Sequence, residues 1–312
     1  FLVEGIRYQY GFELTAQRIT AEYLLVYKHP KPQTWFRRTL DPQTGQDRFE
    51  FTDKLRGPKD TWREATKPNS LFLSTAVQLN SEQLRPAFGW FAETLIVHDL
   101  TPAMFRSRTT AEMLKHPEGK RQICDFLNTA DISIADIFVT ERKVMLESTA
   151  QNALTGQLER KAVEHDLQHI QFLHTTQSGT AVLRLDEESS GTQRLFLLTG
   201  PVLDILAKGQ TLVVDELDTS LHPLLVRHLV RLFHSPRSNP KGAQLLFSTH
   251  DSSLLNQAVF RRDQIWFVEK GPEQSSKLYP LTEFSPRKNE ALEAGYLAGR
   301  YGALPFFRDW PE

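Results

Sequence analysis

The sequence predicts an α/β fold with a parallel sheet, and two short strands with the helix between them carry that prediction. Thr211 to Val214 is a short run of strand-forming apolar residues, and Asp215 and Glu216 follow it directly. Residues 244–248 form a second apolar run, after which come Thr249 and His250. The carboxyl ends of parallel strands are where α/β proteins bind ligands, so both runs place polar side chains where a site is expected.

The pair Asp215-Glu216 has the chemistry of a magnesium-dependent site for phosphate transfer or hydrolysis. An aspartate here can hold Mg²⁺, partly through water, because this ion prefers oxygen ligands and keeps part of its hydration shell. The neighbouring glutamate can orient the water that attacks a phosphate. A strand followed by Asp-Glu occurs by chance in many proteins, so the interpretation depends on the motifs around it.

Those motifs occur in a fixed order on both sides of the acidic pair. Upstream, Glu188 to Arg194 reads ESSGTQR and opens a predicted helix that runs to Leu206. Small residues at a helix N-terminus leave backbone N–H groups open to anions, although an ordinary serine N-cap is the simpler alternative for Ser189. Downstream, residues 217–223 read LDTSLHP, and Pro223 suits the first turn of the next helix.

From Leu185 to Asp251 this order resembles the ATP-binding cassette (ABC) nucleotide domain of the SMC and DNA-repair type. The resemblance implies an SMC-like ATPase head that binds Mg-ATP between two subunits, with an antiparallel β sub-sheet and an inserted helical lobe. Asp215 (Walker B) would then bind the metal, Glu216 the attacking water, and His250 the γ-phosphate. A buried structural histidine is the alternative for His250.

The resemblance also implies roles for two loops that face the nucleotide of the opposite subunit. They are the signature loop, with Ser189, Ser190 and Gly191, and the D-loop, with Asp218. The signature departs from the common LSGGQ spelling, because Glu188 stands in the leucine place and Ser190 in the first glycine place.

Two further parts of such a site are a Q-loop glutamine and a phosphate-binding loop. Gln78, at the end of the run Leu71 to Asn80, is the candidate Q-loop glutamine that would reach the metal and the attacking water; an exposed glutamine at a helix start is the alternative. A phosphate-binding loop requires G-x-x-x-x-G-K-[ST], and this string does not occur in the sequence. We expect that loop upstream of Phe1, a degenerate ATPase being the alternative.

We expect three segments along the chain. Residues 1–108 are predicted to hold β-hairpins, with strands around Glu4-Gly5, a strand over Ile19 to Tyr27 and a turn at residues 41–45. A generic hairpin module would also explain these features. A helical stretch is predicted from Leu84 to Val97. Residues 109–178 are predicted to be a mostly helical lobe, with helical stretches over Ala111 to Leu127 and Glu141 to Phe172 and a strand-like piece over Asp131 to Val139 between them. Residues 179–312 are predicted to be the C-terminal ATPase lobe, with strands over Gly179 to Leu185 and over 264–269. His165, His169 and His174 share helical spacing, which fits exposed helix residues better than a metal site.

Composition sets limits on partners and compartment. The formal net charge of −1 gives no general attraction to DNA, although local basic patches stay possible. Cys124 is the single cysteine, which fits a reducing cytoplasm and excludes a disulfide framework. No apolar run reaches the roughly 18–20 residues that span a bilayer, so no membrane partner is expected.

The opening EGIRYQYGFEL and the stretch YLAGRYGALP (Tyr296 to Pro305) resemble a narrower group: SMC-like AAA ATPases of bacterial phage-defence and abortive-infection loci, of the RloA, PARIS and Septu types. That resemblance implies a homodimer or higher oligomer that switches with ATP and controls a separate nuclease or toxin. The alternatives are an SMC-class DNA-repair ATPase and a nucleotide-independent scaffold for an effector.

Overall fold

The computed structural model describes the backbone of residues 1–98, 108–130, 132–151, 158–176, 179–288 and 290–305. Side chains are described for these residues except positions 98, 108, 141–151 and 158–168. The chain divides into two compact units, Phe1–Ile96 and Val97–Glu312, and each is considered by itself.

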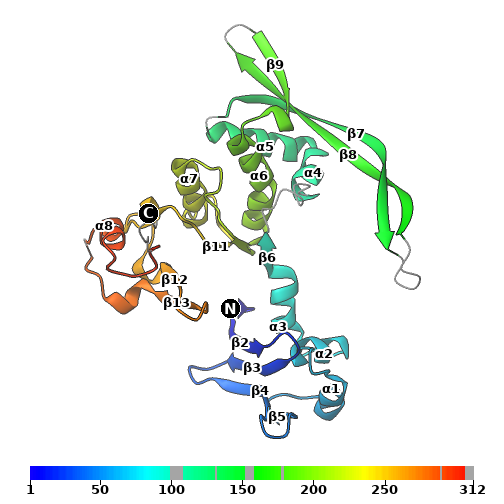
Figure 1. Ribbon diagram of the computed structural model, residues 1–312, viewed down its shortest axis with the longest axis vertical. Helices are drawn as coiled ribbons and strands as arrows, with labels where there is room; N and C mark the ends of the chain where they lie inside the picture. Colours follow the sequence, from blue (N-terminus) through cyan, green and yellow to red (C-terminus); the bar gives the residue numbers. More distant parts are fainter. Residues whose placement is uncertain (99–107, 131, 152–157, 177–178, 289, 306–312) are drawn as a thin grey trace, which may run out of the picture. The chain divides into compact units, whose positions relative to one another are not determined.

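The first unit contains an antiparallel five-stranded sheet in the order β1-β2-β3-β4-β5 (Figure 1). Its strands follow the chain order: β1 (Leu2–Val3), β2 (Ile6–Leu14), β3 (Ile19–Tyr27), β4 (Gln33–Leu40) and β5 (Asp47–Phe51). Glu4 and Gly5 have positive φ angles of 50° and 76°, which close the first tight turn. The predicted hairpins, the strand over residues 19–27 and the turn at residues 41–45 are confirmed.

Helices of the first unit pack on this sheet. They are α1 (Lys59–Ala65), α2 (Phe72–Gln78), α3 (Arg85–Gly89) and the π-helical turn η1 (Trp90–Thr94). The core joins sheet residues such as Leu24 and Phe36 to Phe72 of α2, all fully buried. The helix predicted from Leu84 to Val97 is right as far as Thr94 and wrong beyond it.

Beyond Thr94 the chain forms strand β6 (Leu95–His98), the outer strand of a sheet with order β11-β10-β6. Ile96 and Val97 are β-branched and prefer strand geometry, and pairing in that sheet outweighs the helical spacing of the residues before them. The boundary between the two units falls inside β6.

The second unit holds the predicted ATPase core. Strands β10 (Thr211–Val214) and β11 (Gln244–Phe247) are parallel, with Val214 opposite Phe247. Helix α6 (Ser190–Lys208) precedes β10, and α7 (Pro223–His234) connects β10 to β11. All four elements lie where the sequence predicts them, and Leu212, Val214 and Leu229 form part of a buried core between sheet and helices.

The inserted helical lobe is only partly present, and this is the main correction to the predicted fold. Helices α4 (Arg108–Leu114) and α5 (Pro117–Thr129) exist, but β7 (Ile134–Gln151) and β8 (Leu158–Thr176) form a long antiparallel hairpin where a helix was expected from Glu141 to Phe172 (Figure 1). The strand-like piece predicted over Asp131 to Val139 is confirmed as the start of β7, and the strand predicted from Gly179 is confirmed as β9 (Gly179–Arg184), which continues this sheet.

The hairpin begins and ends on core residues. Ile134, Ile137 and Phe172 are at most 3% exposed, and the Phe172 ring meets Phe196 of α6 edge to face at 5.1 Å. Strand formers at the base of the hairpin and cross-strand pairing with a distant segment decide the structure. Spacing within one segment cannot reveal that pairing.

The C-terminal part carries the ribbon of β12 (Trp266–Lys270) and β13 (Ser276–Pro280) and the helix α8 (Leu292–Leu297). The strand predicted over residues 264–269 is confirmed with a shift of one or two residues. Short 3₁₀ turns (η3 to η6) complete the unit at residues 185–187, 252–254, 262–264 and 281–284. Within the described residues, none of the helices has the length and apolar character required to cross a bilayer.

Candidate functional site

The ends of the two parallel strands are joined by one serine. The hydroxyl of Ser248, directly after β11, donates a short hydrogen bond to Asp215 Oδ1 and accepts one from the backbone N–H of Glu216 at 2.8 Å. The backbone N–H of Leu217 also donates to the Ser248 carbonyl at 3.1 Å. The acidic pair is therefore fixed relative to both strands.

Glu216 is exposed and held in an unusual conformation. Its φ of 49° lies in the left-handed region, which is costly for a residue with a side chain and is found most often at functional sites. Its carboxylate accepts a hydrogen bond from Thr219 Oγ1 at 3.1 Å and lies 3.6 Å from His250 Nε2, with 53% of the glutamate side chain exposed. The geometry leaves the carboxylate open to a water molecule and a ligand.

His250 is brought to the same place. Its side chain is 84% exposed, so the alternative of a buried structural histidine is wrong. Its backbone N–H lies 3.3 Å from one carboxylate oxygen of Asp218 and 3.4 Å from the other. Asp218, predicted as a nucleotide contact, thus also ties the D-loop to the loop after β11.

Arg194 is a part of the site that the sequence reasoning missed. It lies in α6, one turn after the signature residues, is 8% exposed, and donates from Nη2 to the Glu216 carbonyl at 3.0 Å. Burial lowers the pKa of its guanidinium, and the nearby charges of Glu216 and Asp218 act in the opposite direction. In the sequence ESSGTQR this arginine is only one charged helix residue; its burial, and with it the need for a partner, becomes visible only in the fold.

The signature loop is the N-terminus of α6. Ser189 is the N-cap, and its hydroxyl accepts from the backbone N–H of Thr192 at 3.1 Å, so the N-cap interpretation is correct. A Cβ at Gly191 would lie 3.0 Å from the Ser220 carbonyl, tighter than ordinary contacts. A side chain at Gly191 would therefore push the signature loop away from the D-loop. The first-turn N–H groups of a helix have no intrahelical acceptors and are suited to bind an anion; the phosphate role of Ser189 and Ser190 stays a prediction.

Gln78 lies in a different unit from the other candidate residues. It is the exposed last residue of α2, rather than a residue at a helix start, and it belongs to the first unit, whereas the other candidates belong to the second. Its Q-loop role stays a prediction.

The predicted histidine series does not lie on a helix. His169 and His174 are in β8, and the side chain of His165 lies outside the described residues. His174 Nε2 is 2.6 Å from Glu188 Oε1, and Nδ1 is 3.0 Å from the Ser133 carbonyl, which links the hairpin to the signature loop.

The donor set at the strand ends suits magnesium rather than zinc or iron. Across the described residues there is no group of three or more His, Cys, Asp or Glu side chains that could hold a metal ion. Magnesium is commonly bound by one or two carboxylates, with water and substrate phosphates completing the shell. Asp215 with the hydroxyl of Ser248 beside it fits that requirement.

Comparison with known proteins now identifies the class. Residues 1–256 match the family described as "AAA domain, putative AbiEii toxin, Type IV TA system". The match spans well over half of the chain, which therefore belongs to this AAA-type ATPase family. No curated protein matches the sequence.

Proposed function

We propose that this protein binds and hydrolyses ATP as an ABC-type head, with its catalytic carboxylate at Glu216. One observation carries the proposal: Asp215, Glu216 and His250 converge at the ends of two parallel strands, joined through Ser248. Membership of an AAA-domain family supports the same chemistry.

Each residue has a separate task in this scheme. Asp215 would hold Mg²⁺, which supplies electrostatic stabilisation to the phosphates when bound. Glu216 orients the attacking water through its exposed carboxylate and accepts a proton from it, while His250 donates a hydrogen bond to the γ-phosphate. Gln78 would contact the same water and metal. Arg194 and Thr219 hold Glu216 in place from its carbonyl and its carboxylate.

The site is proposed to be shared between two copies of the chain. The signature loop at the start of α6 offers N–H groups and the positive end of a helix dipole to an anion. Ser189, Ser190 and Gly191 would bind the nucleotide held by the opposite copy, and Asp218 would lie at that interface. ATP binding then closes a homodimer or higher oligomer, and hydrolysis opens it.

We further propose that this cycle controls a separate nuclease or toxin in antiphage defence in the cytoplasm. The support is the family description, which names a toxin–antitoxin system, and the resemblance to defence-locus ATPases. The motifs recognised in the sequence account for ATP chemistry only, so the damaging activity is assigned to a partner. Expression of the full-length protein alone tests this: growth arrest without any neighbouring gene would contradict a separate effector.

The ATPase proposal is tested on the natural full-length protein with Glu216→Gln. The amide keeps the shape of the carboxylate but cannot accept a proton from the water, so turnover should fall about 10²–10⁴-fold while ATP still binds. Glu273→Gln, at an exposed position of the same unit, is the matched control. Near-normal phosphate release by Glu216→Gln would refute the role of Glu216.

A further inference from the structure

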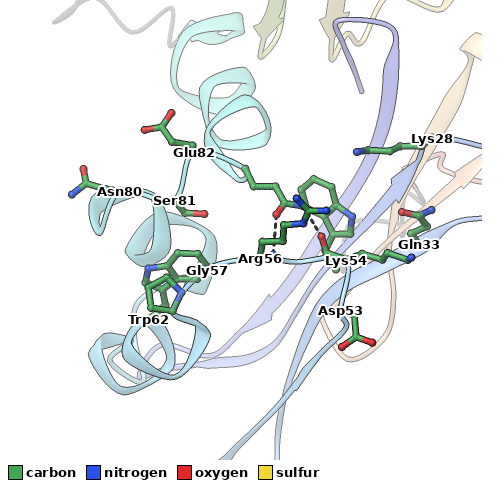
Figure 2. Close-up of a pocket in the computed structure, with 13 residues that line it drawn as sticks. Lys28, Gln33, Asp53, Lys54, Arg56, Gly57, Trp62, Asn80, Ser81 and Glu82 are labelled. Carbon is green, nitrogen blue, oxygen red and sulfur yellow. Dashed lines mark hydrogen bonds between the residues drawn. The ribbon is translucent and has the colours of Figure 1, made fainter.

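The first unit contains an open cavity of about 690 Å³ that the proposed ATPase chemistry does not use. Its wall is formed by the turn after β3, the start of β4, the segment after β5, the tryptophan of α1 and the turn after α2. Lys28 and Gln33 lie on one side of it, Asn80 and Ser81 on the other, and the segment with Lys54 is seen between them (Figure 2). The volume is within the range of small-molecule sites.

The charges around this cavity favour an anion. Lys28, Lys54 and Arg56 line it, and none of them has a carboxylate partner within ion-pair distance in the described part of the chain. Of the two acidic residues in the wall, Glu82 is paired with Arg85 at 3.0 Å. Its charge is thus already compensated, and Asp53 alone opposes three cations.

Buried donors in the same wall also lack acceptors. Trp62 and Ser81 are each 2% exposed, Trp35 is 3% exposed, and the two indole N–H groups and the Ser81 hydroxyl have no hydrogen-bond partner within the described residues. Indole N–H groups can only donate. These donor atoms are themselves covered and are not exposed to the cavity, so recognition of a ligand depends on the exposed cations of the wall.

The segment that carries the cations is held rigidly. Gln83 accepts from the Arg56 backbone N–H at 2.9 Å and donates to the Lys54 carbonyl at 2.7 Å (dashed lines in Figure 2). Gly57 has a φ of 115°, and a Cβ there would lie 2.3 Å from the Trp62 ring, so the backbone passes directly over the indole. A fixed loop loses little conformational entropy when a ligand binds.

We propose that this cavity is a binding site for a small organic phosphate of nucleotide size, separate from the proposed ATP site. Arginine and lysine match phosphate oxygens, and the amides of Gln33 and Asn80 in the wall can both donate and accept.

The test is calorimetric titration of the full chain with inorganic pyrophosphate and with ADP, in EDTA so that magnesium does not load the other site. Lys54→Ala/Arg56→Ala should weaken binding at least about tenfold, because charge-assisted hydrogen bonds are lost. Arg37→Ala/Lys67→Ala removes the same charge from exposed positions outside the cavity and should leave affinity within about twofold.

A second variant separates binding from folding. Lys28→Ala removes an exposed side chain of the cavity wall, so the melting temperature should hardly change, while affinity should weaken about two- to tenfold. Lys54 and Arg56 have no role in the proposed ATP site, so their effect distinguishes the cavity from that site. The proposal is overturned if neither probe binds, if Lys54→Ala/Arg56→Ala binds as tightly as the natural protein, or if only a single-stranded oligonucleotide binds.

Discussion

Replacing Glu22 by alanine should destabilise the first unit by about 3–5 kcal/mol, because three hydrogen-bond donors lose the acceptor that they share. Glu22 is fully buried in β3, and burial raises the pKa of its carboxyl group, although hydrogen bonds to the carboxylate oppose this. It accepts hydrogen bonds from the backbone N–H groups of Phe72 at 2.7 Å and Leu73 at 2.9 Å and from the Tyr10 hydroxyl at 2.9 Å.

The magnitude follows from what the change leaves behind. Three donors in the core lose their acceptor, and an unsatisfied buried donor costs about 1–3 kcal/mol. Arg38 Nη1 is 3.8 Å from Glu22 Oε2, but Arg38 Nη2 is also paired with Asp47 Oδ2 at 2.8 Å. The charge of Arg38 therefore stays compensated when Glu22 is removed. Removing a desolvated carboxylate offsets part of the loss, which keeps the expected total well below the sum of the donors' maximum costs.

Urea unfolding followed by tryptophan fluorescence measures this change, because Trp35 and Trp62 are both buried in the same unit. Glu13→Ala, at an exposed position of β2, should cost less than about 0.5 kcal/mol. Tyr10→Phe should cost less in the Glu22→Ala background than in the natural protein, since its hydroxyl then has no acceptor to lose. A loss below about 1 kcal/mol for Glu22→Ala would show that the network does not stabilise this unit.

Three further outcomes follow from local geometry and the proposed site. Gly57→Ala should cost about 1–3 kcal/mol in the same unfolding assay, because its Cβ would meet the Trp62 ring; an unchanged midpoint would contradict the contact. A hydrogen bond from Tyr301 lowers the pKa of Glu290 from 4.5 to about 2. The stabilisation from the ionised Glu290 is therefore present above pH 4.5 and is lost as the pH falls towards 2. Glu290→Gln should reduce the pH dependence of the free energy of unfolding over that range, and an unchanged dependence would contradict this role of Glu290. Mixing inactive Glu216→Gln and Gly191→Asp chains should restore part of the ATPase activity if the site is shared; proven heterodimers without activity would exclude sharing.

The fold was predictable wherever the signals are local. The start of α6 is marked by the serine N-cap at Ser189, α7 by Pro223 in its first turn, and β10 by a β-branched apolar run. The turns of the first sheet are marked by Gly5 and Gly45, both with positive φ. These signals act within a few residues, so one sequence is enough to read them.

The long hairpin could not be predicted in this way. Asp131 to Val139 is strand-like in the sequence, but Glu141, where a helix is expected, pairs with Gln168 of the opposite strand, and this distant partner decides that the segment is a strand. Charged and apolar residues alternate there in a pattern that also fits a helix, and side-chain spacing alone does not choose between them. Strand pairing depends on non-local contacts, whereas helix signals are contained in the segment itself.

The acidic residues of the site could be predicted from the sequence, but the residues that hold them in place could not. Asp215, Glu216 and His250 follow apolar strands and are visible in the sequence, whereas Ser248 and Arg194 act through hydrogen bonds that only the fold creates. The sequence shows Ser248 only as the end of a strand, whereas in the structure its hydroxyl joins the two strand ends. Polar residues that bridge two loops carry no spacing signal, because their partners are far away in sequence.

The contacts that Arg194 and Gly191 of α6 make indicate how the two halves of the proposed composite site are coupled. The loop from Glu216 to Ser220 contains two non-glycine residues with positive φ, 49° and 62°, so its conformation is maintained by contacts from outside. Arg194 of α6 holds the Glu216 carbonyl, and Gly191 at the start of α6 fits against the Ser220 carbonyl. Both contacts come from the helix whose first turn would bind the nucleotide of the opposite subunit. A displacement of α6 on nucleotide binding would therefore change both ends of this loop together, and with them the orientation of the catalytic carboxylate.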